Sequence, residues 1–161
     1  MGKIAVRAAR AGDSPAIVEI HVHARRSYYE GHLPEAELVQ WANTVRATGY
    51  ADRTELPDRS WLCAHLDGVV VGFALTTDAE LLQLQVHPDH WGLGAGSALH
   101  AACVEVWRAA GVEVAGLDVF EPNLRARRFY ACHGWREVGT EGDPPHVRME
   151  LDVPPAFGTV R

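Results

Sequence analysis

The stretch Val86-His87-Pro88-Asp89-His90-Trp91-Gly92-Leu93-Gly94-Ala95-Gly96-Ser97 decides the fold of this chain. Glycines at alternate positions stand between a strand pattern and a helix pattern. Glycine lets the backbone turn sharply and lets a ligand approach it closely. Successive N–H groups can then point into one hollow, and the following helix adds the positive end of its dipole. The stretch therefore predicts a diphosphate-binding loop.

The glycine spacing separates this loop from two common nucleotide motifs. A P-loop is excluded because no Gly-Lys-Ser/Thr is present. The spacing is G-x-G-x-G rather than G-x-G-x-x-G, and the preceding strand belongs to an antiparallel meander, which disfavours a Rossmann unit. Taken alone, the spacing is also compatible with a plain strand-to-helix connection.

Strand and helix patterns surround this loop. Apolar residues alternate in strands and recur every three to four positions in helices. Asp67-Gly68 is typical of a hairpin turn, because both residues tolerate positive φ. We expect strands at 3–8, 61–66, 69–77, 80–86, 112–120, 136–140 and 146–151, and helices at 15–29, 35–48, 97–110 and 123–132. The order β-α-α-β-β-β-α-β-α-β-β predicts a single α/β (α+β) domain over residues 1–153, followed by a tail at 154–161.

Composition limits the classes of function. The chain has 161 residues, a net charge of −6 and 47% hydrophobic residues, which suits one globular domain. Its basic cluster, Arg125, Arg127 and Arg128, is too small for a general nucleic-acid face and fits a phosphorylated small molecule better. No apolar run is long enough for a membrane span, and a cytoplasmic location is expected. Neither the three cysteines nor the nine histidines show a metal-binding spacing, so no metal is expected.

A second informative stretch covers residues 121–135. Asn123 is a good helix N-cap. Ala126, Phe129 and Tyr130 lie at i, i+3 and i+4, so they share one face of the predicted helix. This spacing fits a buried core tyrosine as well as a catalytic phenol.

Together the two stretches resemble the GCN5-related N-acetyltransferase (GNAT) superfamily. Its phosphate loop reads Arg/Gln-x-x-Gly-x-Gly/Ala, and the chain has Trp91-Gly92-Leu93-Gly94-Ala95-Gly96. Its later pattern, Asn-x-x-Ala-x-x-Phe-Tyr-x-x-x-Gly-Phe/Trp, is matched from Asn123 to Trp135. The element order agrees over nearly the whole chain. Trp91 departs from the pattern, since an indole is not expected to make the polar contact of Arg or Gln; backbone amides should supply most of the phosphate contact.

The resemblance implies transfer of an acetyl group from acetyl-CoA to a primary amine of a small molecule or peptide. It also implies a mixed, mostly antiparallel sheet whose central strands splay to admit acyl-CoA. A non-catalytic acyl-CoA sensor or partner-binding module of the same fold is the alternative. The family often forms homodimers, whereas nucleic-acid and membrane partners are not expected. By resemblance, coenzyme A would contact Leu84, Gln85, Val86, Trp91, Gly92, Leu93, Gly94, Ala95, Gly96, Ser97, Asn123, Ala126 and Tyr130.

The resemblance also assigns catalytic roles. Tyr130, with an ordinary pKa of about 10, would protonate the departing sulfur. A backbone N–H near Leu84 or Gln85 would stabilise the developing oxyanion. Glu80 would act as the base, directly or through water, although a solvated charge at a strand end is equally consistent with its position. The other candidate bases are Glu30, Asp118 and His65, and a water chain without any side-chain base is a further alternative.

The acceptor is expected near the connection between the first two helices. This segment combines aromatic side chains with one carboxylate, and loops commonly carry specificity. An open groove would favour a peptide acceptor, and an acidic pocket would favour an aminoglycoside. The predicted substrate-binding residues are Tyr28, Tyr29, Glu30 and His32.

Overall fold

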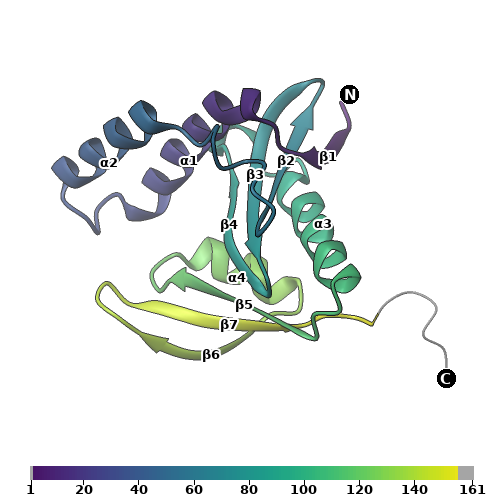
Figure 1. Ribbon diagram of the computed structural model, residues 1–161. Helices are drawn as coiled ribbons and strands as arrows, with labels where there is room; N and C mark the ends of the chain where they lie inside the picture. Colours follow the sequence, from purple (N-terminus) through teal and green to yellow (C-terminus); the bar gives the residue numbers. More distant parts are fainter. Residues whose placement is uncertain (1, 156–161) are drawn as a thin grey trace.

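The computed structural model describes residues 2–155 (Figure 1). The end of the predicted tail, residues 156–161, lies outside the described residues, as does residue 1. The order of elements confirms the predicted α/β (α+β) domain. In chain order the elements are β1 (Ile4–Ala8), a 3-10 turn (Ala11–Asp13), α1 (Ser14–Tyr29), α2 (Glu35–Thr48), β2 (Ser60–Leu66), β3 (Val69–Thr77), β4 (Glu80–Val86), a second 3-10 turn (Pro88–His90), α3 (Ala95–Ala109), β5 (Val114–Phe120), α4 (Leu124–Cys132), β6 (Arg136–Glu141) and β7 (His146–Asp152).

The strands form one mixed sheet in the order β1-β2-β3-β4-β5-β7-β6. Every neighbouring pair is antiparallel except β4 and β5, which run parallel. The predicted hairpin turn is confirmed, with φ values of 52° at Asp67 and 82° at Gly68. β5 begins at Val114, two residues later than predicted, because the N–H of Val112 still donates to the carbonyl of Trp107 in α3.

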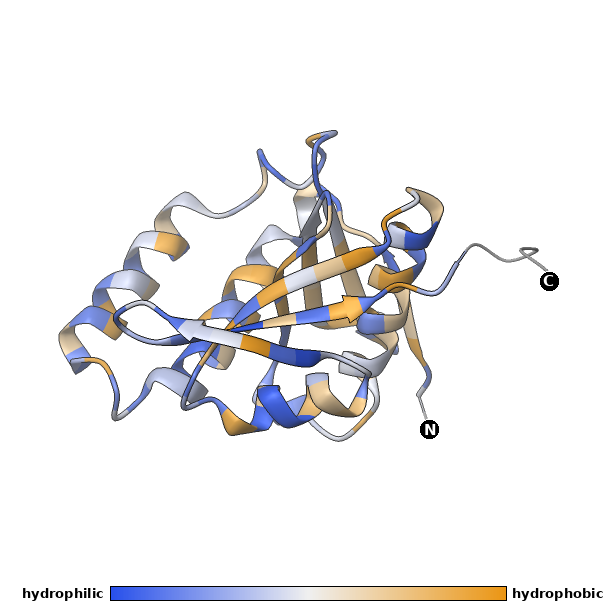
Figure 2. Cartoon of the chain, turned by 90° about the horizontal axis from the view of Figure 1, so that it is seen from below, coloured by the Kyte–Doolittle hydropathy of each residue, from blue (hydrophilic) through white to orange (hydrophobic). Residues whose placement is uncertain are grey.

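Helices cover both faces of the sheet. Successive strand residues point to opposite faces, so along β3 Ala74 packs on the α3 side while Phe73 packs on the α1 side. On α3, Leu99 and Trp107 are fully buried against the first face, and on α1 Ile17 is fully buried against the second. Figure 2 shows hydrophobic and hydrophilic residues mixed along the helices and strands, as expected for elements with one face in the core. No helix within residues 2–155 is both long enough and apolar enough to cross a membrane.

The sheet opens between β4 and β5. These strands pair at a single position, Glu80 with Gly116, beside one hydrogen bond of 2.8 Å from the Gly116 N–H to the Ala79 carbonyl. Beyond that point they diverge, and Figure 1 shows β5 running away from β4 at a steep angle. The β5-facing backbone of β4 from residue 81 onward therefore has no strand partner within the described residues.

An ion pair closes the apex of this opening. The Arg148 guanidinium of β7 donates to both oxygens of Glu80, at 2.7 and 2.6 Å. It passes over Gly116, where an added Cβ would collide with Arg148 Nη2 and lie 2.8 Å from Glu80 Oε2. The missing side chain of Gly116 thus lets β4, β5 and β7 be tied together where the splay begins.

Replacing Gly116 with Val is expected to lower the free energy of unfolding by about 1–3 kcal/mol, because the added side chain overpacks the apex and displaces Arg148 from Glu80. Urea unfolding followed by circular dichroism measures this change. Gly139→Val in β6 is the control, since a Cβ at Gly139 meets nothing within 4 Å. Equal stability of the two variants would contradict the role assigned to the apex.

Candidate active site

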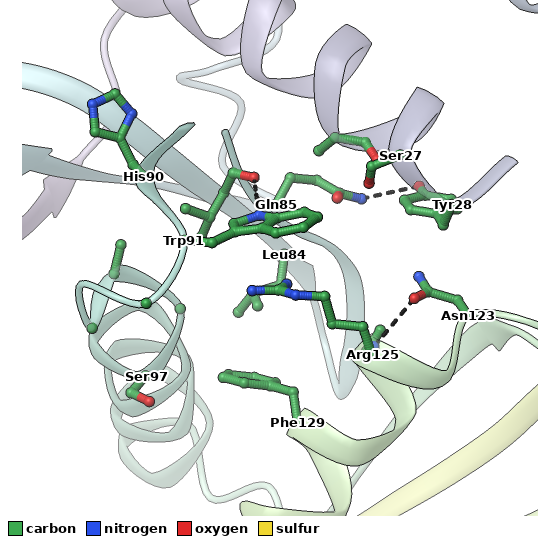
Figure 3. A pocket seen from close by; sticks show the side chains of 17 residues that line it. Ser27, Tyr28, Leu84, Gln85, His90, Trp91, Ser97, Asn123, Arg125 and Phe129 are labelled. Carbon is green, nitrogen blue, oxygen red and sulfur yellow. Dashed lines mark hydrogen bonds between the residues drawn. The ribbon is translucent and has the colours of Figure 1, made fainter. Parts of the chain in front are cut away.

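Two cavities meet at the opening between β4 and β5. The larger has a volume of about 320 Å³ and lies between the glycine-rich loop, β4 and α4 (Figure 3). The smaller, of about 180 Å³, lies between β4, β5 and the end of α1. Tyr28, Leu84, Gln85 and Asn123 line both cavities, so they form the throat between them. A ligand threaded through the throat would reach both cavities.

The glycine-rich loop leads directly into α3. Gly92 and Gly94 have left-handed φ values of 81° and 93°, which favour glycine. The helix begins at Ala95 rather than at residue 97, because Gly94 itself is the N-cap and the first helical bond runs from the Ala98 N–H to the Gly94 carbonyl, at 3.0 Å. The N–H groups of residues 94–97 precede that bond and have no partner in the helix. They line the larger cavity at the positive end of the dipole of a 15-residue helix.

Most predicted cofactor residues line this larger cavity. Leu93 does not, because its side chain is 52% exposed outside it. Tyr130 does not either, and instead lines the smaller cavity. The predicted residues that do line the larger cavity are Leu84, Gln85, Val86, Trp91, Gly92, Gly94, Ala95, Gly96, Ser97, Asn123 and Ala126.

Trp91, at the position where the family pattern has Arg or Gln, makes one hydrogen bond and one cation–π contact within the protein. Its indole N–H donates to the Val86 carbonyl at 2.9 Å, which fixes the ring beside the loop. The guanidinium of Arg125 lies over that ring, 3.5 Å from its centre, and projects from α4 into the larger cavity (Figure 3). Within residues 2–155, Arg125 has no carboxylate partner, whereas Arg127 of the same cluster pairs with Glu137. The Trp91 ring thus positions the Arg125 cation where an anionic ligand in the larger cavity could contact it.

The cofactor residues predicted from the sequence do not include Arg125. The available signal was the basic cluster on α4, but the sequence does not show which of its three arginines faces the cavity. The contact with Trp91 selects Arg125, and that contact joins residues 34 positions apart in the chain.

The throat carries a small network of polar side chains. The Gln85 amide donates to the Tyr28 hydroxyl at 3.3 Å (Figure 3). It also donates to Gln83 Oε1 at 2.9 Å. Burial raises the pKa of Tyr28 to about 12, so its hydroxyl stays neutral and can still donate. Asn123 Oδ1 accepts from the Ala126 N–H at 3.2 Å, which leaves the amide NH₂ of Asn123 available to a ligand.

Tyr130 stands at the wall of the smaller cavity. Its side chain is 8% exposed, and its hydroxyl makes no hydrogen bond to another described residue. Burial raises the pKa of Tyr130 well above 10, and the neighbouring Cys103 and Tyr28 raise it further. The phenol is therefore protonated at neutral pH and can act only as a hydrogen-bond donor or acid towards an incoming base.

Comparison with known proteins places this arrangement in a family. The sequence model of the acetyltransferase (GNAT) family matches residues 17–135. The chain belongs to this family. It is accordingly an acetyl-CoA-dependent acyltransferase. An uncharacterized N-acetyltransferase of Mycobacterium tuberculosis is 29% identical over 131 residues, which cover 78% of this chain and 74% of the relative.

Solved acetyltransferases share the fold. The PaiA N-acetyltransferase of Thermoplasma acidophilum, solved in complex with coenzyme A, superposes with a TM-score of 0.82 at 21% identity and covers 93% of this chain and 99% of its own. YncA of Salmonella typhimurium, described as a putative acetyltransferase and solved with its cofactor acetyl-CoA, gives a TM-score of 0.68 at 19% identity over 98% of both chains.

The four predicted candidate bases lie in different environments. Glu80 is engaged by Arg148 at both oxygens, an arrangement that favours a structural carboxylate over a free base. Asp118 lines the smaller cavity but lies 3.5 Å from the same guanidinium. Glu30 lies outside both cavities and pairs with Arg26 at 3.3 Å. His65, on β2, lines neither cavity.

The predicted acceptor residues divide into two pairs. Tyr28 and Tyr29 line the smaller cavity, and Tyr29 packs on Phe120 of β5 with ring centres 4.6 Å apart. His32 lies edge-on to Phe120 at 5.4 Å but, like Glu30, lines neither cavity. α1 ends at Tyr29, so the chain turns away from the cavity before it reaches these two residues.

Within residues 2–155, no three His, Cys, Asp or Glu side chains are grouped in a way that could hold a metal ion.

Proposed function

We propose that this acetyltransferase transfers the acetyl group of acetyl-CoA to a small primary amine by direct attack of the amine on the thioester. The observation that supports this most is the throat. A cavity rich in backbone amides lies on one side, and a cavity walled by Tyr130 lies on the other. A donor and an acceptor can therefore meet from the two ends of the throat without competing for space.

The larger cavity suits the donor. The amides of residues 94–97 and the Arg125 guanidinium would hold the diphosphate, since both present N–H donors to an anion. The unpaired backbone edge of β4 and the Asn123 amide would hold the pantetheine arm. When bound, acetyl-CoA supplies the activated acetyl group. A backbone N–H of Leu84 or Gln85 would stabilise the negative charge that develops on the carbonyl oxygen.

The smaller cavity suits the acceptor. At about 180 Å³ it is smaller than the ~300–1,000 Å³ of typical drug-sized sites, which favours a small amine over a folded peptide segment. Its walls include the rings of Tyr28, Tyr29 and Phe120 and a single carboxylate, Asp118. A single carboxylate among aromatic rings matches a monoamine with an aromatic body better than it matches a polycationic aminoglycoside. Tyr130 would donate its proton to the departing sulfur.

Acetyl-CoA is expected to stabilise the folded protein. At a concentration 100 times the dissociation constant, a ligand that binds only the native state adds about 2.7 kcal/mol to the free energy of unfolding. For a chain of this length, that raises Tm by about 5–10 °C. Differential scanning fluorimetry measures the shift, with ATP as the control ligand that lacks the pantetheine arm.

The acceptor class is then tested by release of the CoA thiol. We expect phenethylamine to be acetylated faster than spermidine, kanamycin or a peptide with N-terminal alanine. The absence of any thermal shift with acetyl-CoA or CoA would overturn the proposed function. Faster turnover of kanamycin or of the peptide would overturn only the acceptor class.

A further inference from the structure

Besides Tyr130, the smaller cavity is lined by His146, whose imidazole can accept or donate a proton. It is the first residue of β7, directly opposite Phe120 at the end of β5. It lines the cavity together with Tyr130 and Leu84. A small molecule bound there can therefore touch His146 and the throat at the same time.

Contacts of the imidazole ring define its tautomer. Nδ1 lies 3.0 Å from the Pro144 carbonyl oxygen. A carbonyl oxygen can only accept, so Nδ1 carries the proton in this hydrogen bond. In the neutral ring, Nε2 then bears a lone pair. Nε2 lies 3.5 Å from the Tyr29 hydroxyl at the end of α1, a distance that leaves this hydrogen bond weak and the lone pair available.

The carboxylates on and beside this cavity, Asp118 and Glu80, both face the guanidinium of Arg148. Both oxygens of Glu80 accept from Arg148, and Asp118 lies 3.5 Å from the same guanidinium. Of the residues that line the smaller cavity, His146 is the one whose basic atom faces no cationic partner within the described part of the chain.

We infer that His146 is the general base that deprotonates the acceptor amine. This inference rests on the proposed function. His146 Nε2 takes one proton from the ammonium group and becomes imidazolium. The nitrogen lone pair so released forms the C–N bond to the acetyl carbon, and the electrons of the C–S bond leave with sulfur. Tyr130 donates its proton to that sulfur. The nitrogen, which is cationic after the C–N bond has formed, loses its second proton through water to the tyrosinate. The imidazolium releases the first proton to bulk water, so that one proton per turnover is released.

The charged and titratable neighbours of His146 come from four elements. They are Tyr29 of α1, Asp118 of β5, Glu141 of β6 and Arg148 of β7. Arg148 is already paired with Glu80 and Asp118, and Glu141 is the cross-strand partner of His146. A variant of His146 itself is therefore needed to separate its effect on the pH profile from the effects of these groups.

His146→Gln is the decisive variant, because Gln can still donate to the Pro144 carbonyl but cannot accept a proton at neutral pH. We expect kcat/KM for phenethylamine, or for the panel amine that is turned over fastest, to fall about 100-fold at pH 7. The acidic limb that protonation of the base gives the pH profile of the native chain should disappear. The thermal shift produced by acetyl-CoA should not change. His32→Gln is the matched control, since His32 contacts the same Phe120 ring from outside the cavity.

Nitrogen NMR of the histidine rings gives a readout that does not depend on turnover. In the native chain at pH 8, the His146 signals should show a protonated Nδ1 and an unprotonated Nε2. A proton on Nε2, or an acidic limb that persists in His146→Gln, would overturn the inference even if acetyl-CoA binds and amines are acetylated. If acetyl-CoA produced no thermal shift in the native chain, the proposed function itself would instead be wrong.

Discussion

Tyr130→Phe is expected to lower kcat at pH 7 by about 100-fold, the smaller end of the range for removal of a general acid or base. The hydroxyl is held neutral by burial, which raises its pKa well above 10, so it can protonate a thiolate in the throat. The phenyl ring of the variant keeps the edge contacts with Phe129 and Trp135, whose ring centres lie 5.4 and 5.8 Å away. Because the hydroxyl has no hydrogen-bond partner among the described residues, its removal leaves no buried group unsatisfied.

The measurement is steady-state release of the CoA thiol, together with the acetyl-CoA dissociation constant from calorimetry. The dissociation constant should not change, since Tyr130 lines the acceptor side of the throat. Tyr50→Phe is the control: Tyr50 is a half-buried tyrosine whose hydroxyl lies 2.8 Å from His21 Nδ1, away from both cavities. A kcat for Tyr130→Phe equal to that of the native chain would refute the assignment of the acid.

Gly94→Val is expected to weaken acetyl-CoA binding by about 100-fold, which corresponds to roughly 2.7 kcal/mol. The φ of 93° at Gly94 is a conformation that β-branched residues rarely adopt. The side chain would be added at the N-cap of α3, among the amides that line the larger cavity. The loop must then either rearrange or present a side chain where the diphosphate would lie.

Gly68→Val separates this local effect from general backbone strain. Gly68 has a similar φ of 82° but lies in the hairpin between β2 and β3, and a Cβ there also meets nothing within 4 Å. Both variants should lose stability, whereas only Gly94→Val should lose acetyl-CoA affinity in calorimetry. Equal affinity in the two variants would show that the loop does not bind the donor.

Much of the fold could be predicted because its signals are local. The Asp67-Gly68 turn follows from two adjacent residues that tolerate positive φ, and the amphipathic helices follow from the spacing of apolar residues. The start of α3 was misplaced because Gly96 is a poor helix former, and the sequence does not show that Gly94 serves as the cap. The expected splay came from family resemblance, since single-strand patterns do not reveal how far neighbouring strands pair.

The site was harder to predict, because its geometry comes from pairs of residues distant in sequence. Glu80 is tied to Arg148, 68 positions away, and His146 meets Tyr29, 117 positions away. Neither pairing leaves a periodic signal. The homodimer, the division into residues 1–153 and a tail, and the cytoplasmic location remain predictions.

The stack of Trp91 and Arg125 gives the protein an optical property. Indole fluorescence responds to a charge lying against the ring, and this guanidinium lies 3.5 Å from the ring centre. An anion that binds Arg125 in the larger cavity should therefore change the emission of Trp91, while the other four tryptophans, which line neither cavity, provide the background. Stopped-flow mixing could then follow arrival of the donor in real time without an attached dye.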